Sequence, residues 1–206
     1  MSSLFSTEAR TEVVAAVREA ESLTSAEFVV VVRREADPHW GAAALFGFVI
    51  SAATLMVLLF ADTEFATHFI PLDLAVAFVA GVALFRVTPF ASRFFVLPRH
   101  RKNAAVQAAK AAFYDLGISK TRDRSGVLLY FAMAERVAVI VEDVGLDTKR
   151  VGAEWSAAVS TAETGIALND SATIAKSILS MGKALSGLYP RKDDDENELP
   201  DEMVAQ

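Results

Sequence analysis

Acidic side chains flank a pair of apolar segments and form the first candidate site of the chain. The segments Gly126–Ala134 and Val137–Val141 are predicted to be strands joined by a tight turn at Glu135-Arg136. In an antiparallel pair, the start of one strand lies beside the end of the other. Carboxylates gathered there, with backbone carbonyls around Gly145, would suit a hard cation such as Ca²⁺ or Mg²⁺. The predicted ligands are Asp123, Glu142, Asp143 and Asp147.

The same carboxylates also have a purely structural interpretation. Asp147 is placed to cap a helix, and Asp143 is placed to form a turn. Arg122 and Arg124 lie close by in sequence, where they would either neutralise the carboxylates or hold a phosphate. Both interpretations, a divalent-metal site and a set of caps and ion pairs, therefore stay open at this point.

Other catalytic groups are scarce in the sequence. The chain has no cysteine, which excludes a disulfide, a thiol nucleophile and Cys-ligated zinc. Its three histidines, His39, His68 and His100, lie near predicted membrane boundaries, and no Ser-His-Asp set is visible. There is no glycine-rich phosphate loop, dinucleotide fingerprint or His-Glu-x-x-His motif. An enzyme built on this chain would depend on its carboxylates.

A second group of acidic residues lies near the C-terminus. The chain has a net charge of −6, and the acidic residues from 193 onward leave the remainder close to neutral. There is thus no global basic field for nucleic acid. The acidic segment is either a solvated tail or a docking segment for a basic surface, its own or a partner's. The candidate docking residues are Asp193, Asp194, Asp195, Glu196 and Glu198.

Two apolar runs near the middle of the chain predict a membrane hairpin. Gly41–Ala61 carries no charge, and Phe69–Phe85 carries only Asp73. A helix needs about 20 apolar residues to cross the hydrocarbon core. The first run meets this length. The second is short, so the bilayer would thin or Asp73 would reach the surface. The alternative is a helical hairpin buried inside a soluble protein.

Basic residues near the two runs predict the orientation in the membrane. They flank the hairpin on its outer sides, whereas the connecting loop Asp62–His68 has no lysine or arginine. By the positive-inside rule, both termini and the globular domain are expected in the cytoplasm, with two spans in a bacterial inner membrane. The basic residues counted are Arg33, Arg34, Arg86, Arg93, Arg99, Arg101 and Lys102.

In the segment Val87–Lys102, Pro89 and Pro98 bound an aromatic and apolar run that lies beside basic residues. This mixture suits an element lying in the headgroup layer, where it would act as an anchor or a sensor of the lipid surface. Alternatively, the aromatic residues pack under the soluble domain. The residues predicted at the membrane interface are Trp40, Arg93, Phe94, Phe95, Arg99, Arg101 and Lys102.

The rest of the chain predicts an α/β fold with a small mixed sheet of three or four strands covered by helices. Glu27–Arg33 contains the continuous apolar run Phe28–Val32, typical of a strand buried on both faces. We expect this strand to be parallel to the next one, because the helix Asn103–Leu116 lies between them. The predicted parts are 1–35 and 103–190 for the α/β domain, 41–86 for the hairpin, 87–102 for the interfacial segment and 191–206 for the acidic tail.

Several segments together resemble the TPM domain family, named for its thylakoid-lumen, photosystem and acetylcholine-receptor-modulator members. Thr24-Ser25-Ala26-Glu27 before Phe28–Val32 resembles the family's opening. Similar features follow at Ala111–Ile118, at Thr121–Leu129 and at Glu135–Asp143 with Gly145. The hairpin and the ending Asp195–Asp201 resemble a bacterial membrane-anchored subgroup.

This resemblance implies one of two functions. Some members are accessory subunits of membrane complexes, and bacterial ones are often associated with LemA-type membrane proteins. Others are described as weak acid phosphatases, and some are thought to bind divalent metal. We therefore expect a membrane-anchored accessory or interaction module, with a divalent-metal-dependent phosphatase of low activity as the alternative. The basic residues that flank the hairpin predict that this domain lies on the cytoplasmic side of the membrane. Many relatives carry the domain on the outer side.

Overall fold

The structure is a computed structural model that describes residues 4, 6–37, 40–61, 66–88, 97–192, 198–199 and 203–205. The chain divides into two compact units, and each is described by itself. One unit joins residues 1–36 to residues 102–206, and the other comprises residues 37–101. Candidate docking residues 193–196 and interface residues Arg93, Phe94 and Phe95 lie outside the described residues.

The described residues of the first unit form a mixed sheet in the order β3-β2-β1-β4. Strand β1 (Glu27–Arg33) is parallel to β2 (Gly126–Ala132), and β2 is antiparallel to β3 (Val137–Glu142). These pairings confirm the expected mixed sheet of an α/β fold. A short strand, β4 (Val204–Ala205), adds in parallel to the other side of β1. Strand β4 is not predicted from the sequence, because it lies in the segment interpreted there as an acidic tail.

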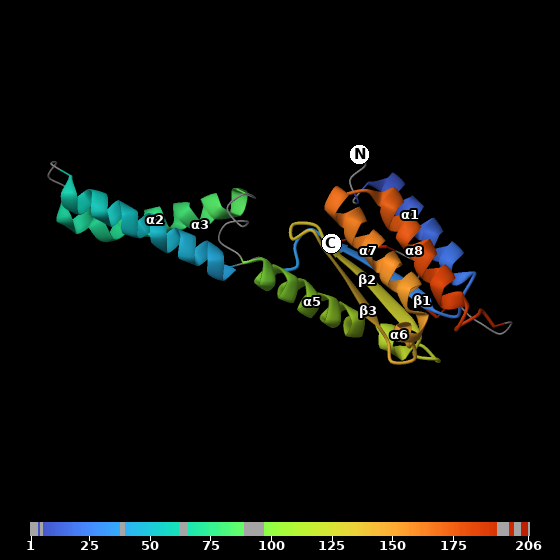
Figure 1. Cartoon of the computed structure of the whole chain (residues 1–206). Coiled ribbons are helices and arrows are strands. Elements are labelled where there is room, and N and C mark those ends of the chain that lie inside the picture. The colour runs from blue at the N-terminus through green and yellow to red at the C-terminus, as the bar shows by residue number, and fades with distance from the viewer. Residues whose placement is uncertain are drawn as a thin grey trace. The chain divides into compact units, whose positions relative to one another are not determined.

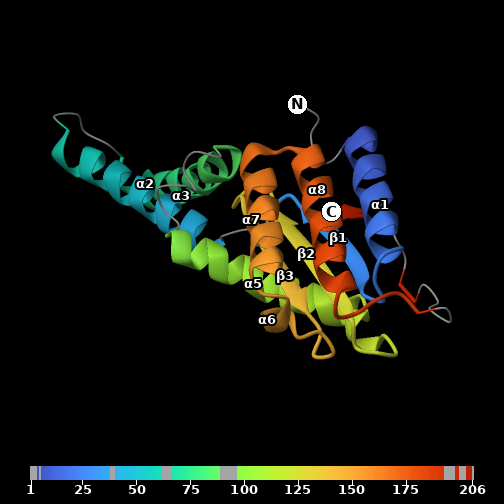
Figure 2. The ribbon, with the colours of Figure 1, turned by 45° about the vertical axis from the view of Figure 1, so that its right-hand side comes forward.

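Helices cover both faces of this sheet (Figures 1 and 2). Phe28, Val30 and Val32 point to the face covered by α1 (Thr7–Glu21), α7 (Ala153–Leu168) and α8 (Ser171–Ser186). Val29 and Val31 point to the opposite face, against α5 (Pro98–Asp115). Each of these valine side chains is at most 4% exposed, as expected for a run without polar alternation.

Local signals set several element ends. The Ser6 hydroxyl accepts a bond of 3.2 Å from the Ala9 amide, and Asp170 caps α8 by accepting one of the same length from Thr173. The turn between β2 and β3 spans residues 133–136 rather than the predicted Glu135-Arg136, because β2 ends at Ala132, and Arg136 has φ 54°. The expected helix after Asp147 is instead divided into a short α6 (Thr148–Val151) and α7, with Gly152 at φ 76° between them.

The second unit is a helical hairpin of α2 (Trp40–Phe60) and α3 (Ile70–Val87). The 3-10 turn Thr67–Phe69 comes directly before α3. Both arms, 21 residues each when the 3-10 turn is included, are long and apolar enough to span a membrane, and only 11% of each apolar window is buried. Glycine allows the helices to approach closely. A Cβ atom on Gly81 would lie 2.8 Å from the Gly47 Cα.

Candidate functional site

Asp143 is a buried carboxylate, and it lies at the end of β3 as predicted. Its two oxygens accept bonds of 2.8 and 2.9 Å from the Arg124 guanidinium, and one also accepts a bond of 2.8 Å from the Val144 amide. The Asp143 hydrogen bond raises the pKa of Arg124. The pair therefore fixes the loop before β2 against the loop after β3.

Gly145 tightens the same connection. A Cβ atom at this position would lie 2.2 Å from the Asp123 carbonyl oxygen and 2.5 Å from that of Arg124. The Gly145 amide donates to the Arg124 oxygen over 2.9 Å. Backbone packing of this kind leaves no room for a side chain, and it directs one carbonyl oxygen around Gly145 into a protein bond rather than toward a cation.

Glu142 is occupied by helical partners. One carboxylate oxygen accepts a bond of 2.9 Å from the Trp155 indole, and the other accepts one of 2.7 Å from the Thr148 hydroxyl. Glu142 thus attaches the beginning of α6 and the first turn of α7 to β3. Neither contact was predicted from the sequence.

The remaining two predicted ligands have separate surroundings. Asp123 pairs with Lys192 and lies 4.0 Å from Arg122, and the hydrogen bond from Lys192 lowers its pKa. Asp147 occupies the N-cap position of α6, but its side chain makes no capping bond there. Its amide instead donates to the Tyr189 hydroxyl over 2.6 Å.

The structure does not gather the four carboxylates into one coordination sphere. Three of them accept hydrogen bonds or ion pairs from different side chains. Among the residues that the structure describes, no group of three histidine or acidic side chains is close enough to hold a metal ion. The geometry favours the structural interpretation, and a Ca²⁺ or Mg²⁺ site remains a prediction.

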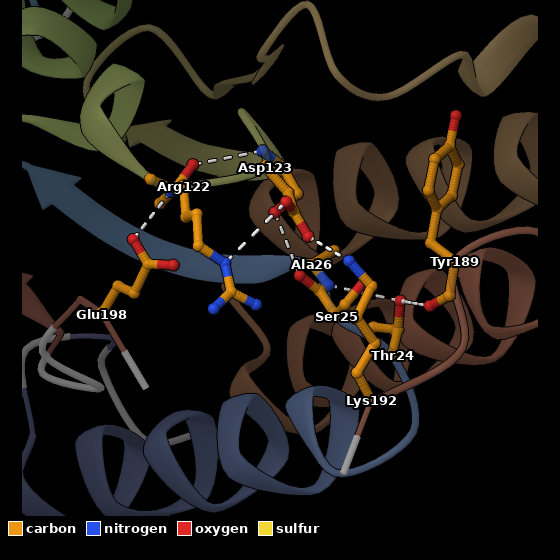
Figure 3. A network of polar contacts seen from close by, with 10 residues as sticks. Thr24, Ser25, Ala26, Arg122, Asp123, Tyr189, Lys192 and Glu198 are labelled. Atoms are coloured by element: carbon orange, nitrogen blue, oxygen red, sulfur yellow. Dashed lines mark hydrogen bonds and ion pairs between the residues drawn. The ribbon is translucent and has the colours of Figure 1, made fainter. Parts of the chain in front are cut away.

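The acidic tail packs partly on its own domain. Lys192 contacts Asp123, and the Glu198 carboxylate accepts a bond of 2.8 Å from the Arg122 amide (Figure 3). Further on, Met203 is only 2% exposed, and Leu199 packs on the α5 side of the sheet. The described part of the tail is therefore not a free chain, and Glu198 docks on its own domain.

Figure 3 also shows a network around the segment that begins with Thr24. The Thr24 hydroxyl donates to the Tyr189 carbonyl over 2.5 Å, and the Ser125 hydroxyl donates to the Ser25 carbonyl over 3.0 Å. The Glu21 carboxylate accepts a bond of 2.9 Å from the Phe28 amide. These bonds join the starts of β1 and β2 to the end of α8. This segment therefore has a structural role.

The described interface residues lie near the ends of helices. Trp40 begins α2 and is 62% exposed, and the Arg86 guanidinium lies 4.6 Å from its ring centroid. Arg99, Arg101 and Lys102 occupy the first turns of α5. A tryptophan and a cation at one end of an apolar hairpin match the composition of a membrane interface.

A groove that the sequence did not predict runs along β3. Its cavity of about 650 Å³ is bounded by β3, by α5 and by the α6–α7 segment. The lining is mainly apolar, with four charged residues, Lys102, Glu142, Lys149 and Glu163. The apolar sequence of β3 does not reveal this groove, because the position of β3 at an edge of the sheet becomes evident only from the strand order.

No protein-family model matches the chain, and no curated protein matches it either. One solved structure is similar, the NMR structure of the BA42 protein from the psychrophilic bacterium Bizionia argentinensis. The two share 18% sequence identity and a TM-score of 0.59, over 98% of this chain and 94% of the other. At this identity, the similarity shows a shared fold.

Proposed function

We propose that this protein is a membrane-anchored, TPM-like α/β domain that acts as an accessory module for a membrane-associated complex. The observation that carries the proposal is the surface of the hairpin. Many of its large apolar side chains face outward, among them Phe48, Met56 and Phe60, which are 60–79% exposed. Such a surface is costly in water and favourable in lipid. The α/β domain, by contrast, buries most of its large apolar side chains in two cores.

In this proposal the hairpin crosses the bacterial inner membrane twice, and both termini and the domain face the cytoplasm. The basic residues flanking the hairpin and the absence of lysine and arginine between residues 62 and 68 support this orientation. The partner is a membrane protein, of LemA type if the family resemblance extends to partners. No nucleic acid is involved in this function.

The alternative function, a metal-dependent phosphatase, gains no support from the geometry. Phosphoryl transfer needs cations placed around the developing charge and a group that orients the nucleophile. The Arg124 guanidinium is bound to both oxygens of Asp143, so its charge is already neutralised. Within the described part of the chain, no group of three or more histidine or acidic side chains could hold a metal ion.

Topology is tested with reporters fused to the full chain. A reporter after Gln206 should be active only as a cytoplasmic reporter, and one inserted at Thr67 only as an external reporter. A Gln206 fusion that is active outside would contradict the orientation. Extraction of the protein from membranes by alkaline carbonate would contradict the anchoring itself.

The accessory role is tested with pure protein and with native membranes. The full chain should hydrolyse phosphate monoesters negligibly with Ca²⁺ or Mg²⁺ present, and it should co-purify with one stoichiometric membrane partner. Deleting the tail is a poor test, because Met203 and β4 are part of the fold. Asp193, Asp194 and Asp195 should be changed to Asn instead. Robust turnover without a partner would refute the proposal.

A further inference from the structure

Strand β3 is an edge of the sheet whose outer side faces the groove. In the described residues β3 pairs with β2 and with no other strand. The Asp143 backbone amide donates to the Gly126 carbonyl oxygen over 2.9 Å, so the backbone groups of Asp143 point toward β2. Because backbone groups alternate along an antiparallel strand, those of Ala138, Ile140 and Glu142 point away from β2. All three of these residues line the groove.

The two walls of the groove flank this edge. Val106 of α5 lies on one side, and Trp155 and Val159 of α7 lie on the other. The cavity touches both walls and the strand between them, so it continues the plane of the sheet. A single added strand would lie about 4.8 Å from β3, within the cavity. A second copy of the domain would bring its own α5 and α7 to the same place.

The opposite edge of the sheet, along β1, is covered by other segments of the chain. There β4 pairs with Val31 and Val32, and Met203 is buried beside it. The Phe28 amide on that side is bonded to Glu21. Proteins usually protect an edge strand with proline, lysine, a bulge or a covering segment. Residues Val137–Val141 include none of these residue types, and the β2–β3 register is continuous, without a bulge.

We propose that the β3 groove binds an extended segment of a partner polypeptide as an additional strand. The segment has alternating apolar residues and an acidic residue near each end. Its backbone bonds to the outward groups of Ala138, Ile140 and Glu142, and its side chains alternate between Val106 and the Trp155–Val159 wall. This inference deepens the proposed accessory function and rests on it, since it names the surface at which the partner is held.

The charges lining the groove select the acidic ends. Lys102 and Lys149 are exposed, and they come from α5 and α6. Glu142 already accepts bonds from Thr148 and Trp155, which leaves Glu163 as the exposed acidic residue of the lining. Glu142 and Glu163 balance the two lysines, so the lining has no net charge, and its positive charges lie at Lys102 and Lys149. An acidic residue at each end of the bound segment would meet one of the two lysines.

The experiment uses the full chain in lipid nanodiscs and a synthetic peptide. The β3 strand of six residues is about 20 Å long, so the peptide has about seven residues, valine alternating with threonine and aspartate at each end. Amide hydrogen exchange is followed by mass spectrometry. The peptide should slow exchange of the outward amides between residues 138 and 142 and leave α1 and α8 unchanged. The same peptide with alternate backbone nitrogens methylated should have no effect.

Two variants test the mode of binding. Ala138→Pro removes an outward amide that makes no bond to β2. It should therefore weaken the binding of the peptide at least tenfold, while the melting temperature stays close to that of the wild type. Lys149→Glu should weaken the binding of the peptide several-fold. The matched charge reversal Lys176→Glu, on the exposed side of α8, should leave this binding unchanged.

Three outcomes would overturn the inference. The first is that millimolar peptide does not slow amide exchange in β3, and the second is that it slows exchange equally in Ala138→Pro. The third is that exchange in β3 slows with rising protein concentration in the absence of peptide, while light scattering shows a dimer. The last result would assign the edge to a second copy. None of these outcomes affects the topology reporters, so failure of the groove is distinguishable from failure of the membrane-anchored function.

Discussion

Asp143 joins the end of β3 to the loop before β2 through both of its oxygens, and this contact predicts a stability effect. In Asp143→Asn, an amide NH₂ would face the Arg124 guanidinium, and one charged acceptor would be lost. We expect the free energy of unfolding to fall by about 1–3 kcal/mol, measured by thermal denaturation in detergent. Asp115→Asn, on an exposed side chain, is the matched control and should change little. Unchanged stability together with lost phosphatase turnover would instead give Asp143 a catalytic role.

Tyr130 carries a fully buried hydroxyl that has no hydrogen-bond partner among the described residues. Tyr130→Phe should therefore leave the free energy of unfolding unchanged or raise it by up to about 2 kcal/mol. Burial raises the pKa of Tyr130. Its contribution to stability is present below the unfolded pKa of about 10 and is lost as pH rises toward the folded pKa.

Alkaline melting curves measure this difference. Above pH 10 the wild type should lose stability more steeply than Tyr130→Phe. A marked loss of stability in Tyr130→Phe at neutral pH would show that the hydroxyl has a partner.

At the residue scale, short-range features could be predicted and long-range ones could not. Ser6 caps α1 through a residue three positions away, a distance at which helix capping is encoded locally. The Trp155–Glu142 bond joins residues 13 apart, and the Glu198–Arg122 bond joins residues 76 apart. Such contacts depend on how elements pack, which residue types and spacing do not determine. The predicted metal ligands failed to converge for the same reason.

Among the elements, long apolar patterns gave reliable predictions and short segments did not. The run within β1 is buried on both faces as expected, and the predicted spans differ from α2 and α3 by one or two residues at each end. Strand β4 has two residues, too few for any periodicity, and it follows a run of acids. Its pairing depends on the exposed edge of β1, so only the assembled sheet specifies it.

The packing of α2 against α3 predicts the effect of enlarging one glycine. Gly81→Leu would force a side chain against the Gly47 backbone and Ile50, so the helices must separate. We expect a loss of about 1–3 kcal/mol in hairpin stability, measured by thermal unfolding in detergent micelles. Gly41→Leu is the matched control, because a Cβ atom there meets nothing within 4 Å. Equal effects of the two substitutions would mean that the close approach of the helices does not contribute to stability.

At the scale of the whole molecule, the hairpin interrupts a domain whose core forms without it. Before the hairpin, the Arg34 carbonyl accepts a bond of 2.8 Å from the Ala134 amide, and the Ala36 amide donates to the Glu135 carboxylate over 3.1 Å. After the hairpin, α5 enters the core from Ala105 onward. The two cores of the domain include no residue of the hairpin among the described residues. We therefore expect that a connection between these two points is sufficient for the domain to fold.

Replacing residues 40–97 with a short polar linker should therefore give a soluble, folded domain. Circular dichroism should show mixed helix and strand with cooperative melting, because β1 still pairs with β2 along its whole length. The same linker variant carrying Val30→Asp places a charge in the core and should fail to fold, which controls for the sensitivity of the assay. Aggregation of the linker variant itself would show that the hairpin is part of the folding unit, and the domain could not then be treated as an independent module on a membrane anchor.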